Sequence, residues 1–425
     1  MADGLDEPLA PKASPVLGYG AVGLAVGLIW LGWQVVLVPL ADRAPAEHAV
    51  RLSPGSAVVL ADASESEWRA GRLENADALA RMALERAPFN LQALRIVGLV
   101  EGETGDRGVA DDLLTLAGNW SLRDDSSHSW LIDNRLRRGD YGSAFAHADT
   151  LARRRAEVRP QLFDLFGTAM ESDPRSVPFL AGELADSPPW RGAFISSLYQ
   201  RDGGVALAAQ LAILMKDSEG RFSDIELQQL YQRLYSAGQT DALRQVRTAL
   251  DRPSAGQTLV DGRFEAESAI LPFGWNLAVG AGYSVAALSD AGPPEAVGGA
   301  SRPSGALRVG HNGQSRDVLA RQVTLLEPGR YRLAGRSRWE LGKSEMVFAW
   351  QMLCPGAERP VGEARFGAPS SASPAGSQTW SPFSVEFQVP AEGCSSQTLQ
   401  LAGENPGRRT DIVIWFSHLQ IEATP

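Results

Sequence analysis

One stretch of the sequence alternates flat apolar side chains with guanidinium groups. If residues 331–340 form a strand, Tyr331, Leu333 and Trp339 share one face. The opposite face then carries Arg332, Arg336 and Arg338. A guanidinium group binds a carboxylate through two hydrogen bonds, so a carboxylated ligand suits this face. The alternative is an ordinary solvated outer surface.

Tryptophan is concentrated in the C-terminal part, where five of the 11 tryptophans follow residue 258. An indole offers a broad apolar face on which a sugar ring stacks. We take Trp339 and Trp350 as the stacking candidates. We expect the other three to pack in the core, namely Trp275, Trp380 and Trp415.

Motifs of catalysis are missing from the sequence. It has no P-loop, HExxH, GxSxG or CxxC pattern, and its five histidines lack metal-ligand spacing. No catalytic residue, metal or cofactor is therefore predicted, although an enzyme with an unfamiliar site in the C-terminal part stays a minor alternative. The net charge of −10 argues against nucleic-acid binding, which needs a basic surface.

The two cysteines, Cys354 and Cys394, each lie next to a turn sequence that contains glycine. A bond between them would close a 40-residue loop and stabilise a protein in an oxidising compartment. We favour the disulfide over two buried free thiols.

Short alternating apolar runs fill the chain after residue 258. Separated by turn residues and free of helical periodicity, they predict a β-sandwich or barrel over residues 259–425, after a linker at 253–258. The predicted strands are 306–309, 320–341, 344–354, 383–389, 397–403 and 411–422.

The order of landmarks in this part resembles carbohydrate-binding modules of the family-4/9 type over nearly all of residues 259–422. The matching positions are Gly262, Phe264, Glu265, Gly274, Trp275, Gln322, Val323, Pro328, Gly329, Tyr331, Trp380 and Phe383. The resemblance implies a jelly-roll sandwich with a glycan ligand. Asp261 replaces the usual Asn, and Ser417-His418 stands where members often carry acidic or amide residues, which argues against a structural calcium.

A 34-residue period marks the middle of the chain. Glycines recur at that step, and an alanine follows each of them five residues later. These residues are Gly71, Gly105, Gly139, Ala76, Ala110 and Ala144. The pattern resembles the tetratricopeptide repeat over about residues 58–156 and degenerates toward residue 252. It implies a right-handed solenoid of helical hairpins over 58–252, with small residues where helices pack, which either binds a protein partner or acts as a spacer.

Residues 16–38 are uncharged and span about 34 Å as a helix, enough to cross a bilayer. We interpret them as a transmembrane helix between a cytoplasmic tail (1–15) and a linker (39–57). The alternative, a cleaved signal peptide, fits less well because the apolar run is long and the start is acidic.

Together these patterns predict a multidomain α-then-β chain with a single transmembrane helix, a helical solenoid and a C-terminal sandwich. We expect a non-enzymatic periplasmic adaptor, anchored in a bacterial inner membrane, that serves envelope or exopolysaccharide assembly and export. The solenoid would bind a protein partner and the sandwich a polysaccharide. The alternative is a pure protein-interaction scaffold without sugar binding.

Overall fold

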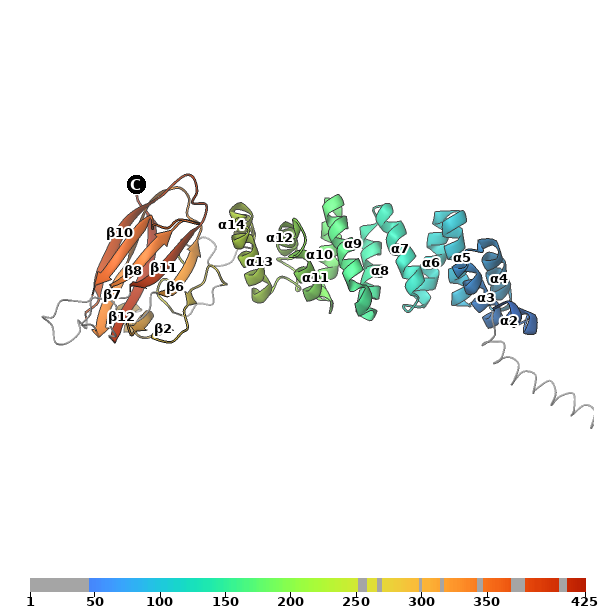
Figure 1. Ribbon diagram of the computed structural model, residues 1–425, viewed down its shortest axis with the longest axis horizontal. Helices are drawn as coiled ribbons and strands as arrows, with labels where there is room; N and C mark the ends of the chain where they lie inside the picture. Colours follow the sequence, from blue (N-terminus) through green and yellow to red (C-terminus); the bar gives the residue numbers. More distant parts are fainter. Residues whose placement is uncertain are drawn as a thin grey trace, which may run out of the picture. The chain divides into compact units, whose positions relative to one another are not determined.

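The computed structural model contains a helical N-terminal half followed by β-strands (Figure 1). The described residues are 46–250, 258–265, 270–297, 300–313, 317–341, 347–367, 379–404 and 411–425. The chain divides into two compact units between Glu183 and Leu184. The predicted membrane segment, 16–38, lies outside the described residues; none of the helices within them has the length and apolarity to cross a bilayer.

The first unit consists of consecutive helices that pack in pairs (Figure 1). Side chains at the starts of several helices accept hydrogen bonds from free backbone N–H groups, as Ser56, Asn90 and Asp124 do. The helices are α2 (Ala46–Leu52), α3 (Ala57–Arg69), α4 (Leu73–Arg86), α5 (Leu91–Thr104), α6 (Arg107–Trp120), α7 (Asp125–Arg137), α8 (Tyr141–Arg154), α9 (Arg159–Ser172) and α10 (Val177–Ala185).

The periodic small residues lie at the helix contacts and turns. Ala76, Ala110 and Ala144 are each fully buried, as expected where two helices approach closely. Gly71 and Gly139 have φ of 72° and 73°, a left-handed conformation that favours glycine. Gly105, the second of the three, has a φ of −125°, so a left-handed backbone does not explain the glycine at this position.

A buried histidine pair joins α7 to α8 in this unit. His128 Nδ1 lies 2.9 Å from His147 Nδ1, and Arg135 Nη1 lies 2.8 Å from His147 Nε2. Because the guanidinium donates to Nε2, His147 carries its proton on Nδ1 and donates it to His128. Burial, followed by the positive charge of Arg135, lowers the pKa of His147 to about 4. Burial also lowers the pKa of His128.

The second unit begins with four helices and continues with the strands. The helices are α11 (Arg191–Leu198), α12 (Gly204–Leu214), α13 (Asp224–Ser236) and α14 (Thr240–Ala249). The strands are β1 (Asn276–Leu277), β2 (Tyr283–Leu288), β3 (Pro294–Val297), β4 (Ala300–Pro303), β5 (Ala306–His311), β6 (Asp317–Thr324), β7 (Gly329–Leu341), β8 (Val347–Leu353), β9 (Gly362–Gly367), β10 (Ser381–Val389), β11 (Gln397–Glu404) and β12 (Ile412–Ala423).

The strands form two five-stranded antiparallel sheets that enclose one core, which confirms the predicted sandwich. Sheet A has the order β1-β6-β11-β8-β9, sheet B has the order β10-β7-β12-β5-β2, and β3 and β4 form a separate hairpin. Alternate side chains of each sheet point inward, as Leu399 and Leu401 do from β11 and Ile414 and Phe416 from β12.

The last helices belong to the same compact unit as the sandwich. The ring of Tyr231 in α13 meets Phe273 edge-on at 5.5 Å between centroids, and the Arg247 guanidinium of α14 lies 4.0 Å from the centre of the same ring. All three side chains are buried. The predicted linker, 253–258, lies outside the described residues except for Thr258. These buried contacts join α13 and α14, which precede the linker in the sequence, to the sandwich, which follows it.

The histidine pair predicts loss of stability in acid. Unfolded His147 takes up a proton near its ordinary pKa of 6.5, whereas the folded residue does so only near 4. The unfolded state therefore binds more protons between these values, and stability falls as the pH drops through this window. At pH 4.5 we expect a loss on the order of 2 kcal/mol relative to pH 7. Urea unfolding of the wild type and of His147→Gln measures it; equal pH dependence in both would contradict the assignment.

Candidate functional site

The three arginines predicted to share a face lie on the outer face of sheet B, while Leu333 points into the core. Two of them, Arg332 and Arg338, contact other side chains of the protein. Arg332 pairs with Glu422 at 2.8 Å. The guanidinium of Arg338 lies 5.1 Å from the ring centres of both Trp380 and Trp415. Arg336 is exposed. Internal partners leave this face less suited to a carboxylated ligand than its sequence implies.

The stacking candidates are placed differently from the prediction. Trp350 is fully buried between the sheets, with Trp275 and Phe416 each 5.5 Å away between centroids. A ligand has no access to it, so its assignment to a glycan surface is wrong. Trp339 points to the same inner side, half-buried against Phe348 at 6.0 Å.

Two tryptophans expected in the main core pack on the outer face of sheet B instead. Trp415 and Trp380 form a small cluster there with Val413. The sequence of β12 indicates the outward position of Trp415, because side chains alternate along a strand and its neighbours Ile414 and Phe416 point inward. Trp380 and Trp415 therefore pack within the protein, as expected. They lie outside the core that the two sheets enclose.

A serine, a histidine and a glutamate meet near the β3–β4 hairpin. The hydroxyl of Ser417 donates to the Gly305 carbonyl at 2.6 Å and accepts from His418 Nδ1 at 2.8 Å. His418 Nε2 contacts Glu295, and this bond, opposed by burial and assisted by the charge of Arg263, lowers the pKa of the carboxyl group. Ser417 is fully buried, and its proton is held by a backbone carbonyl. The trio therefore joins the hairpin to β12 rather than presenting a nucleophile.

The outer face of sheet A carries a row of planar polar side chains. Pairing registers align Asn276, Arg321, Gln400, Gln351 and Glu363 across β1, β6, β11, β8 and β9. The amide of Gln400 donates to Gln351 at 3.0 Å, and that of Gln351 donates to Glu363 at 2.8 Å. We call this set the polar row. Its amide, carboxylate and guanidinium groups are all partly or fully exposed.

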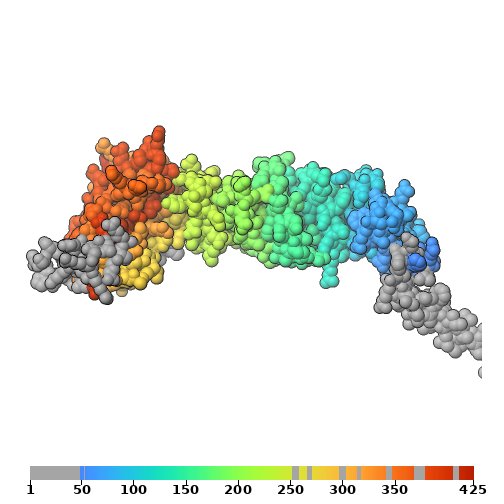
Figure 2. All heavy atoms as spheres, viewed as in Figure 1, coloured from blue at the N-terminus to red at the C-terminus, as the bar shows by residue number. Residues whose placement is uncertain are grey.

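A cleft opens where the polar row meets α13, and its volume is about 280 Å³. The Tyr235 hydroxyl of α13 lies 3.2 Å from Thr398 Oγ1 on β11, which closes one side. Figure 2 shows the yellow-green atoms of the last helices against the sandwich. We call this space the α13 cleft. It is lined by Gln232, Tyr235, Ser236, Leu271, Pro272, Asn276, Arg321, Gln322, Val323 and Thr398.

Charge in the α13 cleft comes from Arg321. Its guanidinium is exposed, and it makes no ion pair with any residue of the described ranges. Gln322, by contrast, is buried and bonded at both ends: its Oε1 accepts from the Val260 N–H at 2.8 Å and its Nε2 donates to the Val260 carbonyl at 2.9 Å. Gln322 thus holds the opening segment of the sandwich against β6.

Sequence reasoning missed the cleft because it searched for aromatic side chains on strands. The amides of Gln351 and Gln400 stand at outward positions of their strands, a pattern visible in the sequence. The aromatic side chain of the cleft comes from a helix more than 150 residues earlier than Thr398. No strand pattern identifies such a partner.

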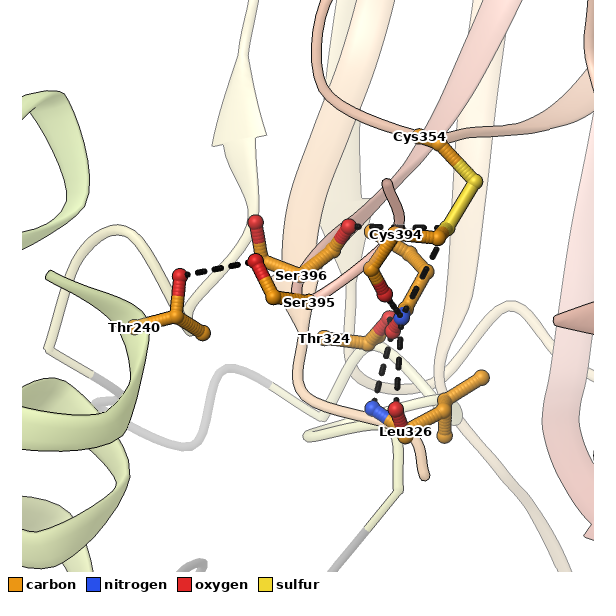
Figure 3. Close-up of a disulfide and its surroundings, with 8 residues drawn as sticks. Thr240, Thr324, Leu326, Cys354, Cys394, Ser395 and Ser396 are labelled. Atoms are coloured by element: carbon orange, nitrogen blue, oxygen red, sulfur yellow. Dashed lines mark hydrogen bonds between the residues drawn. A yellow bond between two sulfur atoms is a disulfide. The ribbon is translucent and has the colours of Figure 1, made fainter. Parts of the chain in front are cut away.

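Cys354 and Cys394 form a disulfide beside the helix contact (Figure 3). The residue after Cys394 is Ser395, whose hydroxyl lies 3.2 Å from that of Thr240 at the start of α14. Gln397 donates to the Cys394 carbonyl at 2.8 Å. The disulfide therefore fixes the loop that contacts the start of α14.

No protein-family model matches the chain, and no curated protein matches it. Similar solved structures include one titled "CBM4 structure and function" (TM-score 0.22, 11% identity, 29% of this chain and 74% of that one). TmCBM61 in complex with β-1,4-galactotriose has a TM-score of 0.23 and 13% identity over 40% of this chain and 99% of that one. The family 11 carbohydrate-binding module of the cellulase Lic26A-Cel5E of Clostridium thermocellum has a TM-score of 0.22 and 10% identity over 40% and 95%.

Loss of the disulfide is expected to destabilise the second unit. Opening a loop with a sequence separation of 40 returns chain entropy to the unfolded state, worth about 4 kcal/mol. Thermal unfolding of Cys354→Ser/Cys394→Ser against the wild type measures the effect, and adding a reductant to the wild type should reproduce it. An unchanged melting temperature in both comparisons would contradict a stabilising bond.

Proposed function

We propose that this chain is a non-enzymatic adaptor that binds a glycan through its sandwich and a protein partner through its helical part. We place it in a bacterial inner membrane, anchored by residues 16–38, with its bulk in the periplasm and a role in envelope or exopolysaccharide assembly and export. The tetratricopeptide-like period of the first helices supports the partner-binding half, because such solenoids present grooves to peptides and helices.

The polar row, opening into the α13 cleft, carries the glycan half of the proposal. Sugars offer closely spaced hydroxyl groups that both donate and accept, which suits amide, carboxylate and guanidinium side chains. Neighbouring strands lie about 4.8 Å apart, so the row presents a polar group at each such interval. This interval is close to the length of one hexopyranose ring in an extended chain.

Exposed apolar surface on the first unit supports a protein partner over a spacer. The rings of Phe89 and Trp120 contact each other at 5.6 Å between centroids and are tilted by 46°, although their exposed fractions are 79% and 46%. A separate hollow of about 300 Å³ lies between α7, α8 and α9, with Ile132, Leu151 and Leu162 in its lining. A helical element that served only as a spacer would have no need of such surfaces.

Removing one amide of the polar row should weaken glycan binding. We expect Gln400→Ala to lower affinity about three- to tenfold, the worth of one or two neutral hydrogen bonds. The measurement is affinity electrophoresis of the full chain against neutral and acidic bacterial polysaccharides, in a detergent whose headgroup is not a sugar. Gln388→Ala is the matched control, because Gln388 is exposed on β10 of the other sheet.

Two results would contradict the proposal. Absence of retardation by every polysaccharide, including the host's own, would leave a protein-interaction scaffold without sugar binding. Retardation that persists in Gln400→Ala but is lost in Arg336→Ala would move the glycan to the outer face of sheet B.

A further inference from the structure

We propose that the α13 cleft binds the carboxylate of an acidic sugar, so that the last helices take part in recognising the glycan. This inference rests on the proposed glycan-binding function and adds to it a ligand class, a hexuronic-acid-containing polysaccharide, and a second set of binding residues from α13. Four observations about the cleft support it.

The charge of the cleft is the first observation. Among the described lining residues Arg321 is the single charged side chain, and its neighbours offer amides and hydroxyls. An exposed guanidinium without an internal ion pair is available for two hydrogen bonds to a ligand carboxylate. Its partners in the row, Asn276 and Gln400, flank it on the adjacent strands and can bind the hydroxyls of the same ring.

The charge of the sandwich supplies no general attraction for an acidic polymer. Residues 259–425 carry 14 basic and 16 acidic side chains, so long-range attraction does not account for binding. On the outer face of sheet B, Arg332 and Arg338 already have partners. Recognition of an acidic glycan therefore depends on a local cation that lacks an ion pair. Arg336 on sheet B is also exposed, but of these two arginines it is Arg321 that lines a cleft with amides and an aromatic ring.

Helix α13 supplies the aromatic wall. Among the described lining residues Tyr235 alone is aromatic; it is half-buried and positioned by its contact with Thr398. Gln232, one turn earlier, is exposed and adds an amide. An aromatic side chain beside a guanidinium and amides provides both the apolar and the polar contacts of a sugar site.

The size of the cleft sets how the ligand lies. Its volume of about 280 Å³ is near the lower limit of the roughly 300–1,000 Å³ typical of small-molecule sites. We therefore place one acidic sugar in the cleft and its neighbours along the polar row, over Gln351 and Gln400. In this arrangement a sandwich from which α13 was removed would lack one wall of the site.

The test compares acidic polysaccharides with their own carboxyl-reduced forms. The full chain is titrated with alginate, polygalacturonate, hyaluronate and the host's acidic polymer, each native and reduced, beside neutral xylan and glucan. We expect binding to a native acidic polymer that weakens at least tenfold on reduction. Arg321→Gln should show about the same loss for the native polymer and no further loss for the reduced one.

Variants of α13 test the helical wall. Tyr235→Ala should weaken binding by about tenfold, whereas Tyr235→Phe, which keeps the ring but loses the hydroxyl contact with Thr398, should weaken it less. Gln232→Ala should weaken binding several-fold, and Gln229→Ala is its matched control, because Gln229 is exposed on the same helix but does not line the cleft. Thermal unfolding of each variant shows that the fold is retained.

The outcomes separate the two proposals. Equal affinity for native and reduced polymers, or an unaltered Arg321→Gln, together with weakening by Gln400→Ala, would overturn the acidic ligand and leave glycan binding in place. Binding that is unaffected by both Tyr235→Ala and Gln232→Ala would overturn the role of α13. Absence of binding to every polymer would reject the glycan function, and this inference with it.

Discussion

The Arg247 guanidinium of α14 lies 4.0 Å from the centre of the Phe273 ring, which Tyr231 of α13 meets edge-on, and these buried contacts join the helices to the sandwich. A buried guanidinium is costly unless other groups compensate for its lost hydration, and here burial lowers its pKa. The contacts of Tyr231 help to hold α13 beside the sandwich, and the α13 cleft depends on that position.

The sandwich imposes the second constraint. Among the described residues its inner faces are filled by apolar side chains from both sheets, so the space between the sheets has no room for a ligand. On sheet B, Arg332 is paired with Glu422 and Arg338 lies 5.1 Å from the ring centres of Trp380 and Trp415, whereas Arg336 is exposed. On sheet A, Gln400 donates to Gln351 and Gln351 donates to Glu363 within the polar row. Arg321 of the same row is exposed and makes no ion pair within the described residues. For this reason the glycan is proposed to bind the outer face of sheet A.

The sequence predicted the features that depend on local periodicity. Helix pairing followed from the glycine and alanine spacing, the sandwich from short alternating runs, and the common face of the arginines from strand alternation. Trp350 was misassigned although the alternation of β8 indicates its burial, since its neighbour Gln351 points outward. The α13 cleft was missed because it depends on a contact between distant segments. Tyr235 reaches β11 through a helical packing that no strand pattern contains.

A glycan bound as proposed lies between α13 and the outer face of sheet A. Hydrogen–deuterium exchange of the full chain, with and without a polysaccharide that it binds, tests this most directly, because it locates the ligand on the backbone. A ligand in this position should slow exchange in residues 224–236, 317–324 and 397–404 together. Slower exchange confined to residues 329–341 and 412–423, with residues 224–236 unchanged, would contradict it and place the ligand on sheet B.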